Sequence, residues 1–467
     1  MSLKDIKKGR WSRQWHLANA GFKAGLGLAG GHLRTLGLPA SERDAAREDL
    51  LREQAQAWVA ELGQLKGSIV KIGQILATYA DYCLPAAIAD ALHQLEADTE
   101  AVAWSRMAPL VEQALGDQQK TLIIETTPLA AASLAQVHRA RRKADGAHLC
   151  LKILYPGIRE TLNSDLAVVT TGLLWWLPKD EQANVRQWLV TVRNVLQEEL
   201  DLALEEKKLQ RWHKRLLHDR RYIVPVVARE YCSGLLLAMS YETGVVQHDP
   251  SVLALSQTRR NQLGINVLEL FLREVLVWGE MQTDPHPGNY RIRLDEGKGD
   301  QIVLLDFGSV RKIEPQWLSP LRHMIVSAYR GDADALLDAV CAAGLLDASA
   351  PDVVKHDFTA VLLGMMEPLN YRAKLADDPH SVPAYAMDTE GNYQWAHAQL
   401  PKRMGKQALH SATSRYFVFP GADFMLLSRK LAGVYAFIAS LDARFDASPV
   451  MEKVLQDADA QYRVTVS

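Results

Sequence analysis

The chain has 467 residues, which is enough for one large two-lobed domain with an extension or for two or three ordinary domains. Its 53 Lys and Arg residues nearly balance 55 Asp and Glu residues, so there is no overall positive field and a nucleic-acid partner is not expected. The four cysteines lie far apart with no paired spacing, which argues against a zinc ribbon or a disulfide framework.

The N-terminal residues 1–40 form an arm in which a stretch rich in Gly, Ala and Leu is surrounded by basic residues. Two interpretations stay open for it: a loosely packed arm, or a segment that lies on a membrane surface. The start of the chain lacks the pattern of a secretory signal, and no segment approaches 18 uninterrupted apolar residues. We therefore expect a cytoplasmic protein with, at most, peripheral contact at the inner face of the membrane.

The apolar residues of segment 51–79 recur at steps of three and four, which predicts a long amphipathic helix. Within it, "GSIVKIGQ" places Lys71 and Gln74 on one face, close to Gly67 and Gly73. Each mid-helix glycine costs about 1 kcal/mol relative to alanine, so we expect another part of the molecule to approach the backbone there. Taken alone, the segment is equally typical of a solvated Lys and Gln.

A small antiparallel sheet is predicted next, from strands at residues 121–125, 134–141 and 148–154. The turn signal Asp145-Gly146 joins the second strand to the third. Lys152 projects from the third, otherwise apolar, strand, and such a lysine needs an anionic partner.

The run "AAAS", residues 130–133, precedes this hairpin at the position where a nucleotide-binding hairpin has glycines over the phosphates. The small side chains of Ala131, Ala132 and Ser133 would let backbone N–H groups approach phosphate. A helix start or packing filler is the alternative interpretation of such a run.

A helical region follows, and in "VLQEELDLALEEKKLQRW" we expect Glu199 and Asp201 on different sides of one helix. Glu205 is spaced to reach back to the strand lysine, although most carboxylates on such a helix are simply solvated. "YIVPVVARE" and "GLLLAMSYETG" are predicted as two further strands, which end near Met239 in a link to the second half.

The second half is predicted to be almost wholly helical, apart from the loop "MQTDPHPGNY" and the strand "QIVLLDFGSV". Two prolines make the first of these a shaped loop that holds Asp284 and Asn289. Asp306 ends the apolar strand, where an ionised carboxylate needs a partner or a metal. The oxygens of Asn289 and Asp306 suit Mg²⁺, and Asp284 is placed to receive or orient a hydroxyl proton.

These features occur in the order that a protein-kinase-like phosphoryl-transfer site requires. The segments "KIGQ", "AAASLAQVHRA", "LKILYPGI", "ELDLALEE", "MQTDPHPGN" and "LLDFG" together resemble the UbiB/AarF/ADCK family of atypical kinases, and most closely its ubiquinone-linked branch. The resemblance implies an α+β, protein-kinase-like bilobal fold. Its parts would be the arm 1–40, a helical KxGQ extension 41–118, an N-lobe with a small antiparallel sheet at 119–243, and a helical C-lobe at 244–467.

The resemblance also implies roles for the nucleotide and metal residues. Lys152 would contact the α- and β-phosphates of ATP or ADP and pair with Glu205, while Asn289 and Asp306 would bind Mg²⁺. Asp284 takes the place of the catalytic-loop aspartate.

Other roles are implied for residues outside the metal site. The alanine-rich loop would face the phosphates, and Met239 would contact adenine through its backbone. A device specific to this family, folded over the active site, would consist of the KxGQ residues Lys71 and Gln74 and the ExD residues Glu199 and Asp201. The chain departs from the common family pattern at Ala135, Ser240 and Gln282.

No Ala-Pro-Glu segment follows "DFG", so a peptide-docking groove is not expected. The hypothesis is an atypical kinase-like ATPase that supports ubiquinone biosynthesis by hydrolysing ATP or phosphorylating a small lipid-like molecule. The expected partners are an isoprenoid or quinone-precursor lipid, ubiquinone biosynthesis proteins and a membrane surface. The alternatives are a nucleotide-sensing module that presents quinone precursors without essential turnover, and a kinase for antibiotics or small alcohols.

Overall fold

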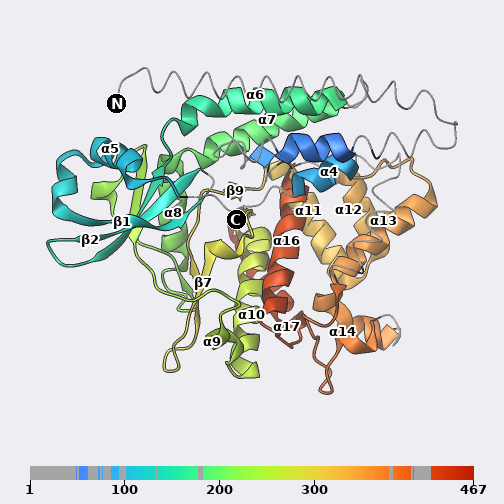
Figure 1. Cartoon of the computed structure of the whole chain (residues 1–467). Helices are drawn as coiled ribbons and strands as arrows, with labels where there is room; N and C mark the ends of the chain where they lie inside the picture. Colours follow the sequence, from blue (N-terminus) through green and yellow to red (C-terminus); the bar gives the residue numbers. More distant parts are fainter. Residues whose placement is uncertain are drawn as a thin grey trace. The chain divides into compact units, whose positions relative to one another are not determined.

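The computed structural model describes residues 52–60, 86–93, 101–132, 134–176, 182–377, 382–400 and 422–466, with single positions between these ranges (Figure 1). The chain consists of two compact units, the first formed by Met1–Glu206 and Val227–Tyr241 and the second by Lys207–Val226 and Glu242–Ser467. Each unit combines helices with small sheets, so the predicted α+β class is confirmed. The finer domain boundaries predicted from the sequence stay a prediction.

The first unit contains a four-stranded antiparallel sheet in the order β1-β2-β3-β5. Its strands are β1 (Leu122–Ala131), β2 (Ala135–Arg142), β3 (His148–Leu154) and β5 (Leu236–Ser240). The predicted β2–β3 hairpin is confirmed, with Gly146 at a φ of +74° in the connection. The prediction for β1 was too short, because the strand continues past register shifts on either side of Pro128, which an edge strand tolerates.

Strand β3 has the alternation that its sequence predicts. Leu149, Leu151 and Ile153 are buried, whereas Cys150 and Lys152 face the other side and are only half-buried. The apolar face therefore builds the core of the first unit and leaves Lys152 on the opposite face.

Helices complete the first unit. They are α4 (Ala86–His93), α5 (Trp104–Leu115), η1 (Gly116–Thr121), α6 (Ile158–Trp176), α7 (Gln182–Glu199), the start of α8 (Leu202–Leu216) and η2 (Arg229–Tyr231). Residues 52–60 are helical, as predicted for the start of the long amphipathic helix.

The expected continuous helix through the ExD residues was wrong. α7 ends at Glu199, and Asp201 caps α8 by accepting hydrogen bonds from the N–H groups of Ala203 and Leu204 at 3.1 and 3.0 Å. A side-chain oxygen that satisfies the first N–H groups of a helix starts a new helix at that point.

The second unit contains short strands, so the prediction that it would be almost wholly helical was also wrong. β4 (Tyr222–Ile223), β8 (Gln301–Leu304) and β7 (Tyr290–Arg293) form a sheet in that order, and β6 (Glu280–Gln282) pairs with β9 (Val310–Lys312). Of the strand expected in "YIVPVVARE", only the two residues of β4 form, and they pair parallel with β8. Strands of two to four residues are too short for hydrophobic periodicity to indicate.

The helices of the second unit follow the chain. They are α9 (Pro250–Leu253), α10 (Gln257–Leu272), the π-helix η3 (Arg273–Trp278), η4 (Pro287–Asn289), α11 (Pro315–Arg330), α12 (Ala333–Ala342), α13 (Asp352–Met365), α14 (Glu367–Asp377), η5 (Ala384–Ala386), α16 (Ala422–Ser440) and α17 (Ser448–Val466). α10 and α16 lie side by side (Figure 1). None of the helices within the described ranges combines the length and apolar character that a membrane span requires.

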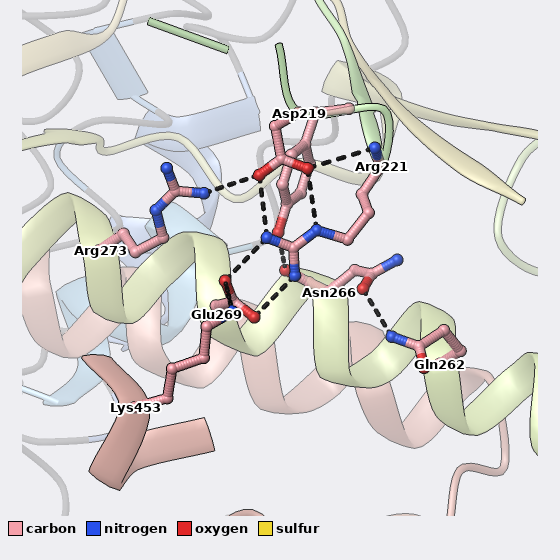
Figure 2. Close-up of polar contacts among 8 residues, drawn as sticks. Asp219, Arg221, Gln262, Asn266, Glu269, Arg273 and Lys453 are labelled. Carbon is pink, nitrogen blue, oxygen red and sulfur yellow. Dashed lines mark hydrogen bonds and ion pairs between the residues drawn. The ribbon is translucent and has the colours of Figure 1, made fainter. Parts of the chain in front are cut away.

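A charge network fixes the strand that leads to Asp306. Figure 2 shows the Arg221 guanidinium between the carboxylates of Asp219 and Glu269, which also accept hydrogen bonds from Arg273 and Lys453. Burial by itself would raise the pKa of Asp219, but the hydrogen bonds from Arg221 lower it to about 2. The Arg221 carbonyl accepts the Ile302 N–H at 2.9 Å, so the network anchors β8 to α10 and α17.

Candidate active site

In the first unit, Lys152 and Glu205 form an ion pair. The Lys152 Nζ donates to Glu205 Oε1 and Oε2 at 2.7 and 2.9 Å, and the two side chains are 16% and 3% exposed. The pairing predicted from the sequence is therefore present. Two hydrogen bonds to one carboxylate hold the lysine amine in a defined position on the half-buried face of β3.

The register of the sheet locates the other nucleotide-binding candidates of this unit. Lys152 pairs with Leu237 of β5, and Cys150, two residues earlier, pairs with Met239. Met239 is therefore two residues along the neighbouring strand from the partner of Lys152. Its side chain is buried, so a ligand would meet the backbone of this strand rather than the thioether.

The alanine-rich connection is only partly available to a phosphate. Ala131 ends β1 opposite Gln136, and the Ala132 N–H donates to the Ala135 carbonyl at 2.8 Å. This N–H is used inside the hairpin, contrary to the expectation that it faces a phosphate. Ser133 lies outside the described residues, as do the KxGQ residues Lys71 and Gln74.

The ExD residues lie at the junction between α7 and α8. Glu199 is half-buried at the end of α7, and Asp201 is exposed at the start of α8. Arg159 of α6 holds this junction through a hydrogen bond from its Nη2 to the Leu200 carbonyl at 2.7 Å. The structure thus gives Asp201 a helix-capping contact.

In the second unit, the loop after β6 brings Asp284 and Asn289 together. The Asn289 Nδ2 donates to the Asp284 carbonyl and to its Oδ2 at 3.0 and 3.1 Å. Pro285 and Pro287 interrupt the backbone donors between them, and His286 accepts the Gly288 N–H at 3.0 Å. The amide nitrogen of Asn289 is thereby committed to Asp284, which turns its Oδ1 away from the carboxylate.

Asp306 lies on the segment next to this loop. It follows β8 by two residues, and the N–H of the adjoining Leu305 donates to the Asn289 carbonyl at 3.0 Å. The Gly308 N–H donates to Asp306 Oδ1 at 2.9 Å. The structure therefore brings Asp284, Asn289 and Asp306 onto two adjoining segments of one unit.

Residues from the second half of α8 support the segment after Asp306. The Lys208 Nζ donates to the Gly308 carbonyl at 3.0 Å, and Trp212 meets Phe307 edge to face at 5.7 Å between ring centroids. Phe307 is 1% exposed, so its burial fixes the backbone on either side of it.

The sequence analysis missed the contribution of α16. Arg429 Nη2 donates to Asp284 Oδ1 at 3.2 Å, and Lys430 Nζ donates to the Tyr290 hydroxyl at 2.9 Å. The only signal was an Arg-Lys pair in an otherwise apolar helix, in the segment "SRKLAGVYAF".

Lys430 also belongs to a buried pair with Glu274 of the π-helix η3, at 3.5 Å. Burial raises the pKa of Glu274 to about 7, with the lysine opposing the shift. Burial alone would lower the pKa of Lys430, but Glu274 and Tyr290 raise it above its ordinary value. Glu274 Oε2 accepts the Gln282 N–H at 3.1 Å, so this pair touches both ends of the loop.

The comparison with protein families supports the kinase-like interpretation. A family model described as an ABC1 atypical kinase-like domain matches residues 94–340, which is more than half of the 467 residues. The match contains the Lys152–Glu205 pair, the Asp284–Asn289 loop and Asp306.

Several curated proteins are similar to the chain over most of its length. The mitochondrial atypical kinase COQ8B of Rattus norvegicus is 29% identical over 452 residues, which cover 95% of this chain and 79% of that protein. The chloroplastic Protein ACTIVITY OF BC1 COMPLEX KINASE 8 of Arabidopsis thaliana is 28% identical over 441 residues, which cover 89% and 56%. The mitochondrial atypical kinase COQ8 of Schizosaccharomyces pombe is 26% identical, and the match covers 70% and 53%. The chain thus spans little more than half the length of two of these three relatives.

A solved structure shares the fold. The chain resembles Rv3197 from Mycobacterium tuberculosis, solved as a complex with erythromycin, with a TM-score of 0.53 and 22% sequence identity. The likeness covers 88% of this chain and 98% of the other. Together with the family match, it confirms the resemblance found in the sequence: the chain is a member of the ABC1 family of atypical kinase-like proteins, whose relatives include the COQ8 kinases.

Proposed function

We propose that the chain binds Mg²⁺ with ATP or ADP and that it hydrolyses ATP, or phosphorylates a small lipid-like molecule, in support of ubiquinone biosynthesis. The observation that carries the proposal is the Lys152–Glu205 ion pair at 2.7 Å. In protein kinases this pairing must form before the lysine can hold the α- and β-phosphates. A lysine fixed by a buried carboxylate is ready to receive a nucleotide without reorganisation.

The donor set of the second unit fits Mg²⁺. Asn289 and Asp306 supply an amide oxygen and a carboxylate, which are the hard ligands that this ion prefers. The hydrogen bond from Asn289 Nδ2 to Asp284 leaves Oδ1 as the amide atom for a metal. A bound Mg²⁺ would neutralise the charge on the β- and γ-phosphates.

Asp284 would orient the attacking water or hydroxyl group. Its carboxylate is half-buried in a loop that two prolines stiffen, and a fixed hydrogen-bond acceptor is what the nucleophile needs. Lys152 and Glu205 on one side, and Asp284, Asn289 and Asp306 on the other, would act on the same nucleotide.

The lipid-like acceptor and the link to ubiquinone are supported by the relatives and by a sequence absence. Two of the similar proteins carry the name COQ8, and the chain has no Ala-Pro-Glu segment after "DFG" for docking a peptide. Isoprenoid or quinone-precursor lipids, ubiquinone biosynthesis proteins and a membrane surface remain the proposed partners.

Phosphate release from ATP tests the proposal. Asp306→Asn removes a charge from the metal site and should reduce the rate by about 100-fold or more. Asp338→Asn, an exposed change in α12, is the matched control and should leave the rate unchanged. Wild-type phosphate release by Asp306→Asn would contradict the proposal.

A second candidate function is a nucleotide-sensing module that presents quinone precursors without essential turnover. It is favoured by the contacts of Asp284, whose two carboxylate oxygens already accept hydrogen bonds from Asn289 and Arg429. The two functions differ in a null strain: Asp284→Asn should fail to restore ubiquinone if turnover is needed and should restore it if binding suffices.

A further inference from the structure

One face of α16 contacts the loop that carries Asp284 and Asn289. Arg429 and Gly433 are four residues apart and therefore neighbours on this face, and Lys430 is adjacent. Arg429 reaches Asp284, and Gly433 packs so closely on Pro285 that a Cβ atom added at position 433 would be 2.1 Å from the proline Cβ. The helix thus meets the loop at its acidic residue and at the proline that follows it.

The carboxylate of Asp284 is held from both sides. Asn289 donates to Oδ2 at 3.1 Å and Arg429 donates to Oδ1 at 3.2 Å. Two donors on opposite oxygens fix the plane of a carboxylate, which one donor alone does not. Asp284 and Arg429 are 20% and 37% exposed, so the pair is partly shielded from water while a ligand could still reach it.

The neighbouring contact fixes the helix relative to the loop. Lys430 is 2% exposed, donates to the Tyr290 hydroxyl and lies 3.5 Å from Glu274, which in turn accepts the Gln282 N–H. Gln282 and Tyr290 lie at the two ends of the loop. A movement of α16 would therefore leave buried charged groups without their partners, which is costly.

From this geometry we propose that Arg429 is a positioning residue for Asp284. The guanidinium holds the carboxylate in the orientation that addresses the nucleophile, and α16 fixes the guanidinium through Lys430 and Gly433. The proposal rests on the ATPase activity proposed above. It assigns to a helix 145 residues further along the chain the task of orienting the loop aspartate.

The test is steady-state ATP hydrolysis by Arg429→Ala and Arg429→Lys, with thermal unfolding of each variant. Arg372→Ala is the matched control, because Arg372 also pairs with an aspartate, Asp446 at 2.7 Å, which lies outside the loop. Arg429→Ala should lower kcat by about 10- to 100-fold with little change in the KM for ATP, since a misplacement of about 1 Å has this effect. Arg429→Lys keeps the charge and should recover part of the loss.

Chemical rescue separates positioning from a structural role. Guanidinium chloride at millimolar concentration should restore part of the Arg429→Ala rate, whereas potassium chloride at the same ionic strength should not. A kcat within about twofold of the wild type for Arg429→Ala would overturn the proposal. A loss that follows the thermal unfolding of the variants, and that neither lysine nor guanidinium repairs, would also overturn it. Wild-type activity of Asp306→Asn would instead refute the proposed ATPase function itself.

Discussion

Gly433→Ala should damage the active-site loop while improving the helix that carries it. The added methyl group would be 2.1 Å from Pro285 Cβ and 2.7 Å from Cγ, whereas ordinary carbon contacts are about 3.5 Å or more. The loop would have to retreat by more than about 1 Å, at a cost of about 1–3 kcal/mol for overpacking. Alanine returns about 1 kcal/mol of helix propensity, so the net loss of stability should be small.

The catalytic effect should be much larger than the effect on stability. A displacement of about 1 Å in the residues that orient a nucleophile lowers kcat by about 100-fold. Phosphate release and differential scanning calorimetry would measure the two quantities, and hydrogen exchange of residues 283–290 would report the loop without relying on activity. Ala432→Gly, at an exposed position of α16, changes helix propensity alone and should leave kcat unaltered. If Gly433→Ala had the kcat and the loop protection of the wild type, the reasoning about this contact would be refuted.

Three further predictions concern stability. Gln136 is fully buried and clasps Val102 through both its N–H and its carbonyl, so Gln136→Leu should cost about 2–4 kcal/mol in urea unfolding. Burial lowers the pKa of His138 below 6.5, so the stability that its neutral ring contributes is full above pH 6.5 and is lost as the pH falls through the lower folded-state pKa. The melting temperature should fall in that window, and His138→Gln should lack this part of the slope. Asp219, with its pKa lowered from 3.8 to about 2, should contribute about 2 kcal/mol that is present above pH 3.8 and lost as the pH falls to 2. Acid unfolding of Asp219→Asn should show a correspondingly smaller dependence on pH between these values.

The features that could be predicted from the sequence are those with local causes. The β2–β3 hairpin follows from alternating apolar residues on either side of Asp145-Gly146, and these signals lie within a few residues of the structure they specify. The pairing of Lys152 with Glu205 came from the order of motifs, and it is a contact that a whole family of folds requires.

The errors also have physical reasons. The chain was expected to continue as a helix through Asp201, although an aspartate before an apolar run is a helix-start signal, and its capping hydrogen bonds decided the outcome. The short strands of the second unit form because partners distant in the chain supply their hydrogen bonds, as β8 does for β4. The contact of Arg429 with Asp284 spans 145 residues, and no local pattern reports such a distance.

The prolines explain why the loop depends on such a distant support. Pro285 and Pro287 give the loop its shape but remove two N–H groups, so a backbone ladder cannot hold it. Side chains take over this task, and Asp284 serves both Asn289 and Arg429 as acceptor. An asparagine at position 284 would bring one NH₂ group toward these donors and could accept from only one of them through its single oxygen. Loss of activity in Asp284→Asn would therefore combine the loss of a hydrogen-bond acceptor for the nucleophile with a disturbed Asn289 amide. The two effects can be separated by the Mg²⁺ dependence of the rate, because only the second acts through a metal-binding candidate.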